Sequence, residues 1–109
     1  MSATELDQAF HALSDANRRA ILRIVRESEM PVGEIAESLG LSQQIVSHHL
    51  KVLRGAGLVT GTRSGTRHLY AVKTEGLTVG KDFFDEFWPS RLTQLKSAVE
   101  LDAMRRTNG

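Results

Sequence analysis

The sequence has 109 residues, which suffices for one domain and not for two, so a single domain over residues 1–109 is expected. Hydrophobic residues make up 40% of it, charged residues 25%, and the net charge is +1, as in ordinary soluble globular proteins. The lack of cysteine excludes disulfides and thiolate metal ligands, and neither a signal peptide nor an apolar run of roughly 20 residues occurs, so we expect a cytoplasmic protein.

Two helices are predicted in the first quarter of the chain. Apolar residues at helical spacing indicate a first helix from about Thr4 to Ser14, and these residues are Leu6, Phe10 and Leu13. Asp15 is a favourable N-cap, because its carboxylate can accept hydrogen bonds from free backbone N–H groups. It predicts a second helix from Ala16 to about Glu27. The residues expected on the buried side of this helix are Ile21, Leu22 and Val25.

Two shorter helices are predicted next, with a tight turn between them. Pro31 interrupts the chain, and the third helix follows it with an apolar face formed by Val32, Ile35, Ala36 and Leu39. Gly40 is expected to end this helix, because a helix C-terminus often needs a residue that tolerates positive φ. Ser42 is a favourable N-cap for the fourth helix, and Gly57 is expected to close it. The apolar stripe of the fourth helix is Ile45 and Val46, Leu50, Leu53 and Ala56.

The segment after the fourth helix has the pattern of a β-hairpin, which would form a wing over residues 58–72. Leu58–Arg63 and Arg67–Val72 are rich in Val, Leu, Thr and Tyr, and Ser64-Gly65 between them is suited to a tight tip. Tyr70 and Val72, two positions apart on the second strand, are expected to share its core-facing side.

The chain ends in a long amphipathic segment, predicted as one helix over about residues 77–105. Its apolar positions follow the spacing i, i+4, i+8, i+11 and i+15 and are Phe84, Trp88, Leu92, Leu95 and Val99. Pro89 falls within this stripe, where it either kinks the helix or opens a new one, and a kink is favoured. With Phe83 and Phe87 the stripe is wider than one helix face. We therefore predict that a second copy of the chain covers it; the alternative is that these aromatic residues line an effector pocket.

The charge is unevenly distributed along the chain. Residues 1–37 contain four basic and seven acidic residues, and residues 75–109 contain five basic and six acidic ones. Between them, Ser38–Thr74 contains no aspartate or glutamate and carries three of the four histidines. The basic residues of this middle segment are Lys51, Arg54, Arg63, Arg67 and Lys73. A polyanion would meet this segment, and double-stranded DNA is the first candidate.

The third and fourth helices, joined by Gly40-Leu41-Ser42, form a predicted helix-turn-helix unit over residues 32–56. If the apolar stripe of the fourth helix faces the core, polar side chains share its opposite face. They are Gln43, Gln44, Ser47, His48 and Lys51. Gln can bond bidentately to adenine, and Lys suits guanine or phosphate, so this face is suited to the major groove of DNA. A face that is only solvated would usually carry glutamates as well, and none is present.

The histidines of the chain receive separate interpretations. His49 lies next to Leu50 on the inner edge of the fourth helix, so a structural, hydrogen-bonded role is favoured over a base contact. His48 is assigned to DNA. Adjacent helical residues diverge by about 100°, so the pair is a poor metal chelate. Asp7 and His11 have i, i+4 spacing and could share a metal, but an exposed helical pair is favoured.

The hairpin supplies a second predicted DNA contact. Arg63 and Arg67 flank the tip, and arginines in such positions suit a narrow minor groove or its phosphates. The alternative is a charged tip that only keeps the hairpin soluble. The residues assigned to the wing and backbone contacts are Ser42, Arg54, Arg63, Thr66 and Arg67.

Four segments carry a resemblance to the ArsR family of bacterial winged-helix repressors. Leu13–Leu22 is similar to the opening pattern of that family, L-x-D-x-x-R-x-x-I-L. Val32–Leu39 and Val46–Val59 resemble its helix-turn-helix. Phe87–Leu92 resembles the F-W-x-x-R-L of a branch that lacks metal sites and includes autorepressors of the SdpR type.

The resemblance implies a mainly α fold with a small β-hairpin, in the order four helices, two strands and one helix. It implies a homodimer built from the first and last helices, bound to an inverted-repeat operator and repressing transcription of its own and neighbouring genes. The residues expected in the dimer contact are Leu6, Phe10, Phe84, Phe87, Trp88, Leu92, Leu95 and Val99.

The sequence departs from the metal-sensing members of the family, and two alternative functions have to be weighed. Metal-sensing members carry a Cys-x-Cys-type pair on the third helix, but residues 32–37 contain no cysteine. Other members carry Asp and His ligands on the last helix, but no histidine follows His68. Metal sensing is therefore disfavoured. No motif implies a cofactor. A winged-helix module that binds only proteins remains the alternative function. An enzyme is disfavoured, because no acid within residues 38–74 could orient a histidine in a local Ser-His-acid relay.

Overall fold

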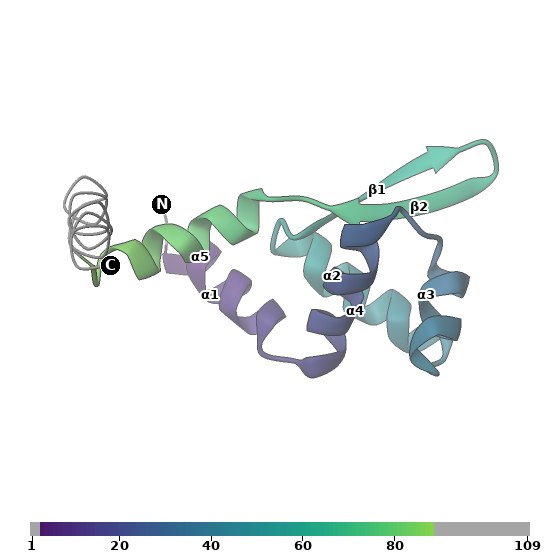
Figure 1. Ribbon diagram of the computed structural model, residues 1–109, viewed down its shortest axis with the longest axis horizontal. Helices are drawn as coiled ribbons and strands as arrows, with labels where there is room; N and C mark the ends of the chain where they lie inside the picture. The colour runs from purple at the N-terminus through teal and green to yellow at the C-terminus, as the bar shows by residue number, and fades with distance from the viewer. Residues whose placement is uncertain (1–2, 89–109) are drawn as a thin grey trace, which may run out of the picture.

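The computed structural model describes residues 3–88, and within this range five helices and one two-stranded antiparallel sheet follow one another (Figure 1). They are α1 (Ala3–Leu13), α2 (Ala16–Glu27), α3 (Val32–Leu39), α4 (Gln43–Gly55), β1 (Val59–Ser64), β2 (Arg67–Val72) and α5 (Glu75–Asp85). The predicted order of elements is confirmed. The last helix begins at Glu75, two residues before the predicted start. Pro89 and the predicted interface residues beyond it lie outside the described residues.

Capping residues define the ends of the helices. The Asp15 carboxylate accepts hydrogen bonds from the backbone N–H groups of Asn17 and Arg18 at 2.8 and 3.1 Å. These bonds, that from Arg18 foremost, lower the pKa of Asp15 below its ordinary value, because they favour the charged form. Ser42 Oγ accepts from the N–H of Ile45 at 3.1 Å, and Gly40 adopts a left-handed conformation with φ of 66°. The tight turn between α3 and α4 therefore has the predicted chemistry.

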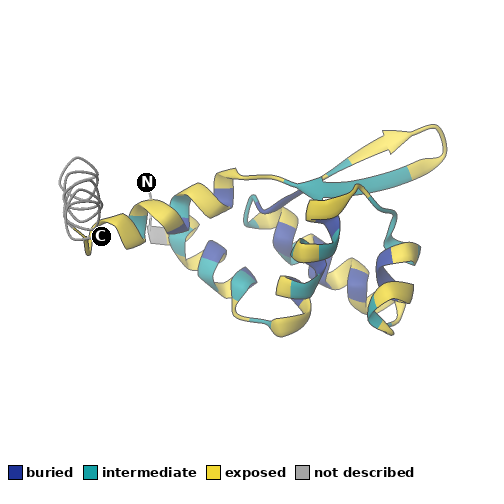
Figure 2. Cartoon of the chain, in the orientation of Figure 1, coloured by how far each residue is buried: buried dark blue, intermediate teal, exposed yellow. Residues whose placement is uncertain are grey.

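A continuous apolar core joins α2, α3, α4 and the base of the hairpin, where Figure 2 shows the buried segments. Its largest fully buried side chains are Ile21, Ile35, Leu50, Leu53, Leu58 and Val46. The predicted placement of Ile45 in the buried stripe is wrong: this side chain is 47% exposed. Adjacent helical residues lie about 100° apart around the axis, so Val46, which is fully buried, takes the core position and Ile45 falls at the edge of the stripe.

The hairpin extends from the body as a wing (Figure 1). Its register runs from Val59 opposite Val72 to Ser64 opposite Arg67, so the loop is Gly65-Thr66 rather than the predicted Ser64-Gly65. Gly65 has a φ of 64° and Thr66 a negative φ, which is the pattern of a type II′ turn. Tyr70 and Val72 pack against the core as predicted.

Helices α1 and α5 lie side by side at the other end of the molecule (Figure 1). The Phe10 ring makes edge contacts with Phe83 and Phe84, each with a centroid separation of 5.6 Å. Gly76, in the first turn of α5, donates its N–H to the Gly57 carbonyl at 2.9 Å. A Cβ at Gly76 would overlap the Ala56 carbonyl, so α5 begins directly against the end of α4. None of the helices within residues 3–88 is long and apolar enough to cross a membrane.

Candidate nucleic-acid interface

One face of α4 is polar and exposed. Each of the five side chains predicted on that face is exposed: Gln43, Gln44, Ser47, His48 and Lys51. The opposite face, formed by Val46, Leu50 and Leu53, is buried. Caps at Ser42 and Gly40 orient α4 relative to α3. Helix α3 packs against α4, and the Gln43 amide lies beside Gly33 of α3, while all five polar side chains remain exposed. The predicted sorting of α4 into a core face and a free polar face is confirmed for these residues.

His49 has the structural role that its position predicts. The side chain is 8% exposed, and Nδ1 lies 3.3 Å from Nη1 of Arg18. Because a guanidinium group can only donate, Nδ1 accepts this bond, and the proton of the neutral ring is assigned to Nε2. His48, one residue earlier, is exposed on the polar face.

Arg18 is the most important residue that sequence reasoning missed. It is 7% exposed, and it donates from Nε to the Ala12 carbonyl at 2.8 Å and from Nη2 to the His11 carbonyl at 2.9 Å. Together with its contact to His49, Arg18 connects the end of α1, the start of α2 and the inner side of α4. The available signal was its place three residues after the N-cap Asp15, but arginines are usually exposed, so composition alone does not indicate burial.

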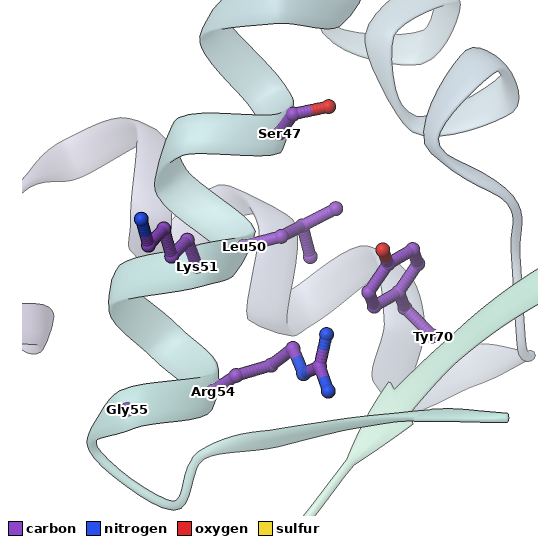
Figure 3. A pocket seen from close by; sticks show the side chains of 6 residues that line it. All are labelled: Ser47, Leu50, Lys51, Arg54, Gly55 and Tyr70. Atoms are coloured by element: carbon purple, nitrogen blue, oxygen red, sulfur yellow. The ribbon is translucent and has the colours of Figure 1, made fainter.

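A cleft separates α4 from β2 and has a volume of about 530 Å³ (Figure 3). The residues that line it are Ser47, Leu50, Lys51, Arg54, Gly55 and Tyr70. Figure 3 shows the Arg54 guanidinium extending from α4 towards β2, with Leu50 facing Tyr70 and Lys51 pointing away. The Tyr70 hydroxyl lies 3.3 Å from Nδ1 of His68 on the same strand. Neither Tyr70 nor His68 was predicted as part of this site.

The wing arginines differ in their surroundings. Arg63 and Thr66 are exposed near the end of the hairpin, as predicted. Arg67 Nη2 instead lies 3.0 Å from Oε1 of Glu34, in the first turn of α3. The wing arginine nearest α3 is therefore held by an ion pair, although both groups remain exposed.

Asp7 and His11 are both exposed on α1.

Comparison with known proteins places this arrangement in a family. A sequence profile of the arsR family of bacterial regulatory proteins matches residues 15–60, which run from the N-cap of α2 into β1. The HTH-type transcriptional regulator Rv2034 of Mycobacterium tuberculosis is 41% identical over 94 residues, covering 86% of this chain and 88% of that protein. The chain belongs to the ArsR family.

Two further similar proteins agree with membership of the ArsR family. The transcriptional repressor SdpR of Bacillus subtilis is 35% identical over 69 residues, covering 63% of this chain and 77% of that protein. The solution structure of a homodimeric winged helix-turn-helix DNA-binding domain from Mycobacterium bovis is 27% identical, with a TM-score of 0.63. It covers 87% of this chain, which covers 80% of it. The predicted resemblance to cysteine-free, SdpR-type regulators is confirmed, and the protein is a transcriptional regulator rather than an enzyme.

Proposed function

We propose that the protein is a homodimeric repressor that binds an inverted-repeat operator and lowers transcription of its own and neighbouring genes. The observation that carries this proposal is the exposed polar face of α4. The opposite, apolar face of the helix is buried in the core, which holds the polar face towards solvent. The polar face contains two amides, one hydroxyl, one imidazole and one ammonium group, with no acid in residues 38–74. Such a helix fits the major groove of DNA.

The side chains of this face have distinct proposed roles. Gln43 and Gln44 suit adenine, which offers one donor and one acceptor in the major groove. Ser47 and His48 contact base edges through their hydroxyl and imidazole groups, and Lys51 binds guanine or a phosphate. The proposed contacts of the backbone and wing are Ser42, Arg54, Arg63, Thr66 and Arg67. In this arrangement the amides and the hydroxyl supply sequence preference, and the cations supply affinity.

The proposed dimer forms through the α1–α5 end. Phe84, Phe87 and Trp88 are 49%, 69% and 55% exposed, and Phe84 continues an aromatic cluster that includes Phe10. Exposed aromatic residues in one patch indicate a surface that another protein surface covers. The homodimeric Mycobacterium bovis domain supports a second copy as that partner. To contact an inverted repeat, the two α4 helices of a twofold dimer would lie about 34 Å apart, which is one turn of DNA.

This proposal also assigns a location and a domain organisation. A repressor of chromosomal genes acts where the chromosome lies, so we place the protein in the cytoplasm and on the nucleoid when it is bound. We further propose that residues 1–109 form one DNA-binding unit, with the helix-turn-helix over residues 32–56 and the wing over residues 58–72.

Fluorescence anisotropy with labelled DNA from upstream of the protein's own gene tests the proposal. We expect tight binding to one site, with log affinity that falls linearly with log salt by about 0.9 per phosphate contact. Gln44→Ala should cost about 1–3 kcal/mol on the operator and much less on unrelated DNA, because a lost base contact relaxes specificity. Equal losses on both DNAs would contradict base recognition by α4.

Lys51→Ala provides the complementary measurement. If its ammonium group binds phosphate, all DNA sequences should weaken about equally and the salt slope should fall by about 0.9. Lys73→Ala is the matched control, because it removes the same charge from the segment between β2 and α5, where Lys73 lies 3.5 Å from Glu75. A slope that changes equally in both variants would indicate a general charge effect instead of a contact.

A further inference from the structure

The cleft between α4 and β2 lies between the two elements proposed to enter neighbouring grooves of DNA (Figure 3). Between the major groove at α4 and the minor groove at the wing, the double helix presents a sugar–phosphate strand. That strand must cross the space between the two elements. No acidic residue lines the cleft. The donors that line it are Ser47, Arg54 and Tyr70, while the Lys51 side chain points away (Figure 3).

The floor and the cationic wall of this cleft suit a single anionic group. Leu50 is 1% exposed and faces the Tyr70 ring, so the floor of the cleft is apolar. Arg54 is exposed, and no ion pair links it to any other residue in the 3–88 range. Hydrogen bonds from a guanidinium to a phosphate are strong, and they are stronger beside an apolar surface than in bulk water.

The His68 ring contacts the Tyr70 hydroxyl. Nδ1 lies 3.3 Å from that hydroxyl, and the two rings lie 4.7 Å apart. The His68 ring occupies the space beside Gly61, where a Cβ would come within 2.5 Å of Nε2. Glycine at this strand position therefore leaves room for the ring. When Nδ1 carries a proton and donates to the Tyr70 oxygen, the hydroxyl hydrogen is free to point into the cleft.

We propose that this cleft binds one phosphodiester group of the DNA backbone, with the Arg54 guanidinium and the Tyr70 hydroxyl as its two donors. His68 is a positioning residue that directs the hydroxyl. This inference rests on the proposed function, since DNA must lie on α4 for a strand to reach the cleft. It adds a site that fixes the register of the protein on the duplex without contacting a base.

Methylphosphonate substitution of single operator phosphates tests the site. The wild-type protein should lose affinity most at one phosphate in each half-site. Tyr70→Phe keeps the ring and should weaken binding about fivefold, on operator and unrelated DNA alike, with an unchanged salt slope. Arg54→Gln should also reduce the slope by about 0.9. In both variants the same methylphosphonate should have a smaller effect than in the wild type.

Further variants separate this role from a structural one. Thr62→Val removes an exposed hydroxyl from β1 and is the matched control, with no expected effect on any phosphate. His68→Leu should reduce the effect of the same methylphosphonate, and His68→Asn, whose amide nitrogen can replace Nδ1, should restore it. Circular dichroism melting confirms that each variant is folded, because Tyr70 also packs on the core.

The outcomes distinguish this site from the proposed function. If the wild type binds its operator and Gln44→Ala loses specificity, but Tyr70→Phe keeps the wild-type phosphate profile, the cleft proposal fails alone. A loss confined to one base pair would show that Tyr70 contacts a base, and would also overturn it. Saturable binding of inorganic phosphate in the cleft at micromolar concentration would assign it to a free anion instead. No binding of the wild type to any operator DNA would overturn both proposals.

Discussion

The helix-turn-helix half and the α1–α5 end of the molecule place their large apolar side chains in opposite surroundings. In the first half, Ile21, Ile35 and Leu53 are fully buried by residues of the same chain. At the other end, Phe87 and Trp88 are more than half exposed. Figure 2 shows the same contrast, with buried segments across α2, α3 and α4 and exposed ones along α5.

The difference separates the stability of one protomer from the assembly of protomers. The helix-turn-helix half completes its core within one chain, so changes there should alter the free energy of unfolding of a single protomer. The aromatic end leaves Phe87 and Trp88 exposed, and in the proposed dimer a second copy of the chain covers them, so changes there should alter assembly. Arg18 and Gly76 lie where the two halves meet: Arg18 connects α1 to α4, and Gly76 sets α5 against the end of α4.

Arg18→Met should have the largest effect, because it removes a buried side chain that connects the halves. The Ala12 carbonyl and the His49 ring would lose the Arg18 donor, and the His11 carbonyl would keep only its bonds from Ser14. We expect the free energy of unfolding to fall by about 3 kcal/mol. Urea denaturation followed by circular dichroism measures this loss. Arg19→Met is the control, since Arg19 is exposed and makes one bond to the Leu13 carbonyl at 2.8 Å. Equal losses in the two variants would contradict a special role for Arg18.

Phe87→Ala should have the next largest effect, and it should act on assembly. A buried aromatic residue at an interface commonly contributes about 2 kcal/mol, so we expect the dimer dissociation constant to rise about 30-fold. The melting temperature of the monomer at high dilution should hardly change, because Phe87 is 69% exposed within one chain. Sedimentation equilibrium measures the constant, and Leu77→Ala at the start of α5 is the control. A weakened monomer with an unchanged dimer constant would reverse the contrast between the two ends.

Local sequence signals predicted most of the helix-turn-helix half. Gly40 and Ser42 define the tight turn through backbone chemistry that each residue carries by itself. The inner position of His49 followed from its place beside Leu50 on the helix. Periodicity was less reliable for Ile45, because an apolar residue at the edge of a stripe fits either face, and only packing decides which.

Long-range contacts account for what the sequence did not indicate. Arg67 and Glu34 are 33 positions apart, and their pairing depends on how the wing folds against α3. Gly76 looked like an ordinary glycine, and only its contact with the Ala56 carbonyl explains the absence of a side chain. Tyr70 was predicted as a core residue, and its place in the cleft appears only when α4 and β2 are seen together.

Glu34→Gln should have the smallest effect, and it should increase DNA affinity. The Glu34 carboxylate holds Arg67 at 3.0 Å in an exposed ion pair that DNA binding would have to break or share. Exposed pairs are worth about 0–1 kcal/mol, so releasing Arg67 should strengthen binding by about fivefold at most, and less at high salt. Anisotropy titrations at low and high salt measure the change.

The control for this variant is Glu37→Gln, which removes the same charge from an exposed position on the same helix. Both variants reduce the repulsion between α3 and DNA, and only Glu34→Gln also releases Arg67. We therefore expect a larger gain for Glu34→Gln, and we expect the difference to disappear when Arg67→Ala is added to both. If the two gains stay equal, or if the difference persists without Arg67, the ion pair does not restrain the wing.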